Sequence, residues 1–271
     1  MFNKNELILD KVRSMTAHDL QNGELLLRLT SLEEPTLTCT AEGEEIVDAI
    51  GAVITTLYRA KKATFGATNS LVSLDLAAAQ YGTKKEIASE TNKIVDYDFE
   101  TIAIPEPETE GEAVTVKLKR PIIKDSLTHI YSLAAGEIST GYTIAQQASA
   151  TEFVLGEDNQ TITVPTGLTG KIFVEYQYET TEAVRIVNKT SEFPTSCMLV
   201  IYAFFRDKCD DGMVYEGKII CPKAKLNPES VELNLTSTGK HAFEYTMMKD
   251  YCNDEDVLFT IIVSNDDEDE E

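Results

Sequence analysis

The chain has 271 residues and carries 24 basic against 46 acidic residues, a formal net charge of −22 at pH 7. This length suffices for one large β domain or two ordinary ones, and either is long enough to bury a core. The negative field repels nucleic acid and acidic membranes at a distance, which argues against a protein that grips DNA.

Features of export and membrane insertion are also missing from the sequence. The first ten residues, MFNKNELILD, have no basic region followed by an apolar run, so we expect no signal peptide. No segment approaches the ~18 apolar residues of a membrane-spanning helix, and we expect no membrane partner. The cysteines are odd in number and form no C-x-x-C pair, which favours reduced thiols over disulfides or a metal site. They are Cys39, Cys197, Cys209, Cys221 and Cys252.

The first predicted elements are a strand and then a helix. Glu24–Leu29 (ELLLRL) could be a strand, with turn residues on either side of it. From Glu44 onward apolar residues recur every three or four positions, which predicts a helix with one buried stripe. The stripe consists of Ile46, Val47, Ile50, Val53, Ile54, Leu57 and Tyr58.

The charges at both ends of this segment agree with a helix. Thr40 is a candidate N-cap, acids occupy the first turn, and Arg59, Lys61 and Lys62 occupy the last turn. The β-branched residues from Val53 to Thr56 leave a strand open as an alternative. A second, shorter helix is predicted at Ser70–Gln80, where Gly82 suits the left-handed position that closes a helix.

Residues 83–112 are polar and acidic, which predicts a linker or a long exposed loop. Pro105, Pro107 and Gly111 interrupt this segment. Short strands then follow one another to the end of the chain. The candidates are Val114–Leu118, His129–Leu133, Gly141–Ile144, Glu152–Leu155, Thr161–Val164, Lys171–Tyr178, Cys197–Arg206, Met213–Cys221, Ser230–Leu235, Lys240–Met247 and Val257–Val263.

The alternation within these segments assigns faces. In Lys171–Tyr178 the apolar face carries Ile172, Val174, Tyr176 and Tyr178, whereas Cys197–Arg206 is almost continuously apolar and is predicted to be covered on both faces. Turn residues such as Asn227-Pro228 separate the strands. We therefore predict a mainly β (α+β) fold, an antiparallel β-sandwich or open barrel with one or two helices.

No catalytic, cofactor-binding or metal-binding residues emerge from the sequence. It contains no phosphate-binding loop, no dinucleotide-binding glycine pattern, no nucleophile elbow and no H-E-x-x-H motif. Asp207–Gly212 partly resembles a calcium loop, but Cys209 and Lys218 stand where oxygen ligands are required, so we interpret it as a tight turn, with a weaker cation site of another type as the alternative. His18, His129 and His241 have no neighbouring ligand at helical spacing.

The C-terminal half resembles the tail tube proteins of long-tailed bacteriophages. The resemblance rests on Gly212–Leu226 (GMVYEGKIICPKAKL), Val231–Leu235, Gly239–Tyr245 (GKHAFEY) and the apolar Leu258–Val263. Ala67–Gly82 (ATNSLVSLDLAAAQYG) is also similar to segments of phage virion proteins.

This resemblance implies a structural subunit rather than an enzyme. Such subunits form stacked hexameric rings, contact other tail proteins, and enclose a lumen through which DNA passes without specific binding. The implied location is the virion tail, after synthesis in the cytoplasm of the bacterial host. An acidic lumen would let DNA slip through without the phosphate contacts that give grip. Residues 102–112 and 1–20 are the predicted segments that become ordered on assembly.

The implied organisation has three parts. Residues 1–112 form an N-terminal segment with helices and an acidic loop, packed on a β domain of residues 113–264, and residues 265–271 form an acidic tail. Residues 114–180 are a candidate added β module, because the chain is longer than a minimal tube subunit. Two other functions remain as alternatives: another virion protein (tail terminator, collar or decoration), and a β-sandwich that binds carbohydrate or a receptor through exposed aromatic side chains.

Overall fold

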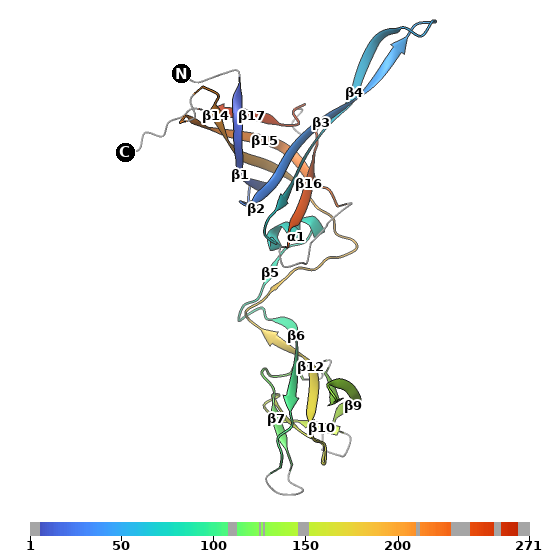
Figure 1. The fold of residues 1–271 in the computed structure, drawn as a ribbon, viewed down its shortest axis with the longest axis vertical. Coiled ribbons are helices and arrows are strands. Elements are labelled where there is room, and N and C mark those ends of the chain that lie inside the picture. Colours follow the sequence, from blue (N-terminus) through green and yellow to red (C-terminus); the bar gives the residue numbers. More distant parts are fainter. Residues whose placement is uncertain are drawn as a thin grey trace. The chain divides into compact units, whose positions relative to one another are not determined.

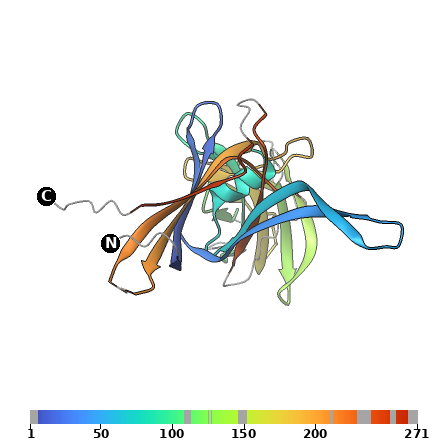
Figure 2. The same cartoon turned by 90° about the horizontal axis from the view of Figure 1, so that it is seen from above.

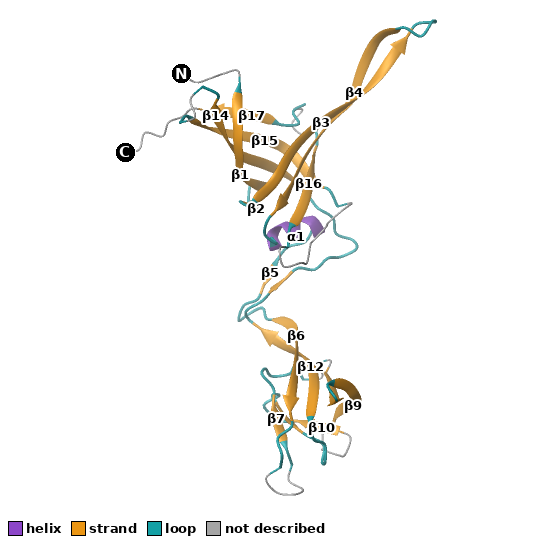
Figure 3. Cartoon of the chain, viewed as in Figure 1, coloured by secondary structure: helices purple, strands orange, loops and turns teal. Residues whose placement is uncertain are grey.

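The computed structural model describes residues 6–107, 113–124, 126, 128–145, 152–209, 212–228, 239–251 and 256–264. Within these residues the protein is mainly antiparallel β-sheet with one helix, as Figure 3 shows, and this confirms the predicted fold class. The chain divides into two compact units. Met1–Lys85 and Ile186–Glu271 form the first unit, and Glu86–Arg185 form the second, which is inserted between them.

A large curled sheet builds the first unit (Figure 1), with the strand order β2-β1-β14-β15-β16-β4-β3. Strand β17 pairs with Glu216–Ile220 of β15, and β16 pairs with Ala224–Leu226 of the same strand. The strands are β1 (Leu7–Asp19), β2 (Leu25–Leu29), β3 (Leu32–Val47), β4 (Val53–Asn69), β14 (Ser196–Asp207), β15 (Val214–Leu226), β16 (His241–Met247) and β17 (Thr260–Ser264).

Helix α1 (Leu74–Tyr81) supplies the fully buried Leu76 to the core of this unit. The Ser73 hydroxyl accepts a hydrogen bond from the Leu76 N–H at 3.2 Å and caps the helix. Gly82 closes it with φ of 70°. The predicted second helix and its closing glycine are therefore confirmed. Strand β14 buries Cys197, Leu199, Ile201 and Ala203 and leaves the residues between them half-buried, so one face is fully covered and the other is covered in part.

The second unit has its own sheet, in the order β6-β12-β8-β9-β10-β11-β7, and its own core. Side chains of β12 and β8 share that core with side chains of β10, β11 and β7. Ile172, Val174 and Tyr176 are completely buried there, as the alternation predicts. The strands are β6 (Ile94–Ala103), β7 (Thr115–Lys117), β8 (Thr128–Ala134), β9 (Glu137–Ala145), β10 (Glu152–Leu155), β11 (Thr161–Thr163) and β12 (Lys171–Thr180). Among them only the β9–β10 pair is parallel within the described residues.

A short ladder joins the two ends of the second unit. Strands β5 (Glu86–Ile87) and β13 (Val184–Arg185) pair antiparallel where the chain enters and leaves this unit. Arg185 Nη2 lies 2.6 Å from Glu86 Oε2 and reinforces the pairing. The domain boundary predicted at residues 112/113 does not coincide with this division, because β6 pairs with β12 along its whole length.

The helix predicted from Glu44 to Lys62 is wrong, because these residues form the outer part of the β3–β4 hairpin. The spacing of three and four residues arises because a turn interrupts the two strands between Val47 and Val53, so one pattern spans two elements. The β-branched run Val53–Thr56, which left the strand alternative open, lies in β4. The predicted buried stripe is exposed to solvent.

Two further expectations require correction. The linker or loop predicted at residues 83–112 is wrong for Ile94–Ala103, which form β6. The expectation that residues 1–20 become ordered only on assembly is wrong for Leu7–Asp19, because β1 already pairs with β14. The predicted strand Ser230–Leu235 lies outside the described residues, as do the acidic tail 265–271 and residues 108–112 of the acidic loop.

Candidate assembly surface

The outer part of the β3–β4 hairpin, residues 40–62, is called the arm here. It extends away from the rest of the sheet of the first unit (Figures 1 and 2). Strand β16 pairs with β4 only at Ala63–Asn69, so the arm lies beyond the last strand that supports the hairpin. Beyond that point β3 and β4 pair with each other up to Val47 and Val53.

Burial changes sharply along β4. At the base of the hairpin Ala63, Phe65 and Ala67 are buried and belong to the core. In the arm Ile54 is 66% exposed and Tyr58 is 75% exposed, although both are large apolar or aromatic side chains. Burying one such side chain fully is worth about 1.5–3 kcal/mol, so any surface that covered the arm would gain free energy from each side chain it buried.

Both faces of the arm carry apolar side chains. Ile46 pairs with Thr55, and Glu44 with Leu57, on one face; Glu45 pairs with Thr56, and Gly43 with the aromatic Tyr58, on the other. Gly43 lies opposite Tyr58, and a Cβ at Gly43 would lie 3.3 Å from the Tyr58 ring. Glycine thus leaves room for this ring, which remains largely open to solvent.

The tip of the arm is a structured turn. Asp48 Oδ1 accepts hydrogen bonds from the N–H groups of Ile50 at 2.9 Å and Ala52 at 2.8 Å. Gly51 adopts φ of 86°, which favours glycine. These contacts fix the turn and present Ile50, whose side chain is 89% exposed, at its end.

Charges on the arm are segregated between its two strands. The β3 side carries Glu42 and Glu44, and the β4 side carries Arg59 and Lys62. Arg59 Nη2 lies 3.5 Å from Glu44 Oε2, and Lys62 Nζ lies 3.8 Å from Glu42 Oε1. Exposed ion pairs of this kind contribute little to stability. They therefore do not offset the cost of leaving the apolar side chains of the arm in water.

Open strand edges add to this surface. At one end of the large sheet β3 pairs only with β4, and at the other β2 pairs only with Met15–His18 of β1, within the described residues. An exposed edge offers backbone N–H and C=O groups to a strand of another chain. The first unit therefore combines an exposed apolar arm with strand edges that a second molecule can extend.

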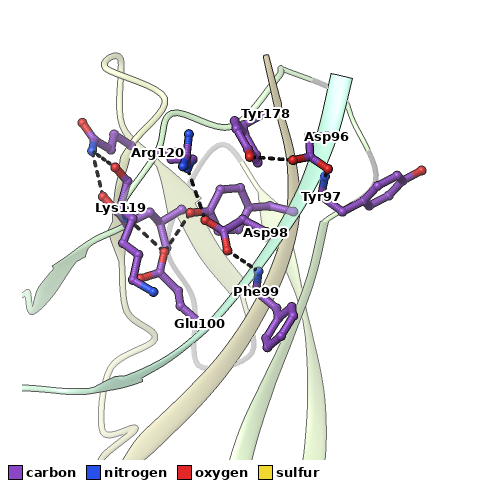
Figure 4. A network of polar contacts seen from close by, with 11 residues as sticks. Asp96, Tyr97, Asp98, Phe99, Glu100, Lys119, Arg120 and Tyr178 are labelled. Carbon is purple, nitrogen blue, oxygen red and sulfur yellow. Dashed lines mark hydrogen bonds and ion pairs between the residues drawn. The ribbon is translucent and has the colours of Figure 1, made fainter. Parts of the chain in front are cut away.

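The second unit contains a polar network that joins β6, β12 and residues 119–120 (Figure 4). Tyr176 donates a hydrogen bond to Glu100 Oε1 at 2.8 Å, and the Lys119 N–H donates to the same oxygen at 3.0 Å. Tyr178 donates to Asp96 Oδ2 at 2.7 Å. Burial, with the neighbouring Glu100, raises the pKa of Tyr176 far above its ordinary value.

Arg120 completes this network. Its Nε lies 3.5 Å from Asp98 Oδ2, and its guanidinium lies 4.3 Å from the centre of the Tyr178 ring. The hydrogen bond from Tyr178 lowers the pKa of Asp96. Asp98 and Glu100 thus fasten residues 119–120 to β6, and Asp96 fastens Tyr178 of β12 to the same strand.

A comparison with protein families matches residues 7–261 to the YomU/Tube protein family. The chain belongs to this family. The match extends across both units and includes the arm, and it confirms the resemblance to phage tail tube proteins. A comparison with curated proteins finds no match.

Among the described residues no three His, Cys, Asp or Glu side chains gather in a way that could hold a metal ion. Asp207, the first residue of the sequence considered as a calcium loop, accepts a hydrogen bond from the Cys209 N–H at 2.8 Å. No helix in the described ranges is long and apolar enough to cross a membrane.

The remaining candidate residues take up separate structural positions in this YomU/Tube protein. His241 is buried, and its Nε2 lies 2.6 Å from Gln80 Oε1 of α1. Cys197 and Cys221 are free and buried, and burial raises the pKa of each thiol to about 12. Sequence reasoning missed the arm, although Asp48 and Gly51 at its turn were a usable signal.

Proposed function

We propose that this chain is the tube subunit of a phage tail, which assembles with copies of itself into stacked rings. The observation that supports the proposal most strongly is the arm, with its exposed apolar side chains on both faces beyond the supporting strand β16. Family membership indicates a tail tube protein, and the arm supplies the surface such a subunit needs to hold a neighbour.

In this proposal the arm of one subunit packs on another copy, and strand edges of the large sheet pair between copies. Closing the edges removes exposed backbone groups, and covering the arm removes apolar area from water. The same proposal includes hexameric rings and contacts with other tail proteins. It also places the protein in the virion tail after synthesis in the host cytoplasm.

The charge of the chain suits a conduit for DNA. A net charge of −22 opposes the many phosphate contacts that hold DNA on a basic surface. DNA leaving through a tube of such subunits would therefore meet little resistance from binding. We propose no catalytic step and no cofactor for this function.

Negative-stain electron microscopy of the purified chain over a range of concentrations tests the proposal. We expect hollow tubes for the wild-type chain and none for Ile54→Asp, because a carboxylate in the arm cannot be buried without a partner. Ile138→Asp is the matched control, since Ile138 is also an exposed strand residue but lies in the second unit (60% exposed, against 66% for Ile54).

Other outcomes would contradict parts of the proposal. A single ring of fixed size that never stacks would indicate a tail terminator or collar protein. A chain that stays monomeric at all concentrations and salts, or tubes that form equally well with Ile54→Asp, would overturn the role given to the arm.

A further inference from the structure

The outward face of the strands β6, β12 and β8 in the second unit carries a group of aromatic side chains. On β6 Tyr97 is 57% exposed and Phe99 is 67% exposed. Figure 4 shows both side chains pointing away from the side of β6 that carries Asp96 and Glu100. The core of the unit lies behind the opposite face, so these rings contribute nothing to it.

Strand register brings rings from three strands together on this face. Phe173 of β12 pairs with Tyr131 of β8. Two residues further along β12, Glu175 pairs with both Phe99 and His129. The ring centres of Phe99 and Phe173 are 6.1 Å apart. Those of His129 and Tyr131 are 6.2 Å apart in a stacked arrangement.

Hydrogen-bonding side chains alternate with the rings. Glu175 lies between Phe99 and His129 across the sheet, and Gln177 lies beside Tyr97. A carboxylate and an amide together offer several acceptors and two donors. A rigid β-sheet thus presents flat rings and polar groups side by side, and an exposed apolar patch bordered by polar groups marks a binding site.

We propose that this face binds a neutral saccharide, a function additional to assembly. The C–H faces of a sugar ring pack on aromatic rings, while its hydroxyl groups donate to acceptors beside those rings. On this face aromatic rings and hydrogen-bond acceptors alternate, so it can make both kinds of contact. The partner is thereby a polysaccharide without charge, such as one displayed on a cell surface.

Charge on the face selects this class of ligand over two others. Glu175 lies in the middle of the face and Glu179 at one end of it, where it pairs with Lys93 at 3.0 Å. An anionic polymer or a nucleic acid would be repelled by Glu175 and by the net charge of −22. A second copy docked face to face would bring the like charges of both copies together, which opposes self-association here.

Titration of the full-length chain with neutral hexasaccharides (cellohexaose, chitohexaose and mannohexaose) tests the proposal, with hexagalacturonate as the anionic comparison. Isothermal calorimetry should show saturable binding of at least one neutral sugar and none of hexagalacturonate. Phe99→Ala and Tyr97→Ala should each weaken that binding about tenfold, the effect of losing one stacking contact. Phe193→Ala, which removes an aromatic ring of similar exposure (63%) in the first unit, should leave it unchanged.

Failure of this inference can be told apart from failure of the proposed assembly. Phe99→Ala should still form tubes under the microscope, because the ring lies outside the arm and the large sheet. The absence of binding by all three neutral sugars, binding that Phe99→Ala leaves intact, or a preference for hexagalacturonate would overturn the saccharide site. Dimerisation of the wild-type chain that Phe99→Ala abolishes would also overturn it, in favour of contact between copies.

Discussion

The two ends of the β3–β4 hairpin have the same backbone structure and opposite surroundings. At the base, Phe65 is 2% exposed and its ring centre lies 6.3 Å from that of Phe243 on the next strand. In the arm, Ile54 lies on the same strand and is 66% exposed. Both are large apolar residues, and only the base has a supporting strand and a core.

This contrast shows that apolar content alone does not tell a core strand from an exposed one. The base contributes to the folding of a single chain, because its side chains leave water when the chain folds. The arm gains that contribution only if a second molecule covers it. Substitutions at matched positions in the two ends of the hairpin test this difference.

The largest effect is expected for Phe65→Ala at the base. Removing this buried ring should destabilise the first unit by about 3–5 kcal/mol, the usual cost of a large cavity in a core. Urea denaturation followed by circular dichroism measures the change. A loss below about 1 kcal/mol would mean that the base is not the packed end of the hairpin.

Gly82→Ala should have the next largest effect, and it has a matched control in the arm. A Cβ at Gly82 would lie 2.3 Å from the backbone of Phe193, and φ is +70°. The cost should exceed the about 1–2 kcal/mol of the left-handed backbone alone. Gly51→Ala at the tip has φ of +86° but no atom within 4 Å, so only the backbone cost applies there. Equal losses in the two variants would contradict the close approach at Gly82.

The stability of the core next to the base should also depend on pH. Burial lowers the pKa of His241 below its ordinary value of 6.5, so the folded state holds the neutral ring and the unfolded state binds the proton more readily. Stability should therefore fall as pH drops below about 6.5, because protonation favours unfolding there. Urea midpoints from pH 7.5 to pH 5 measure this slope, which should be shallower in His241→Gln. An equal slope in both proteins would exclude His241 as its source.

The smallest effect on folding is expected for Ile54→Ala in the arm. Because the side chain is exposed, the free energy of unfolding under conditions that keep the chain monomeric should change by no more than about 0.5 kcal/mol. Thermal or urea unfolding at low concentration measures it against Phe65→Ala. A loss of several kcal/mol would show that the arm is covered by its own chain.

Sequence reasoning recovered most strands of the two units because period-two patterns and turn residues report local structure directly. The alternation in Lys171–Tyr178 identified the buried face of β12, and Gly82 correctly marked the end of α1. The arm was missed because the turn at Asp48–Ala52 fell inside a pattern that also fits a helix. Its exposure depends on where β16 stops pairing, which is a property of the sheet and not of the local sequence.

The aromatic face of the second unit was hidden for a related reason. Tyr97 and Phe99 lie in a segment whose acidic and proline-rich surroundings predicted a loop, and only the pairing of β6 with β12 brings them beside Phe173. The alternative of a β-sandwich with exposed aromatics named none of the residues of this face. Register across three strands cannot be read from any one of them.

Hydrogen–deuterium exchange of the arm, compared between monomer and assembled tubes, measures whether neighbouring copies cover it. Covering the arm should slow exchange of its backbone amides in the assembled form, in the peptides that span residues 44–57, while peptides of the β12 strand change little. Tubes in which these arm amides exchange as fast as in the monomer would show that assembly does not cover the arm.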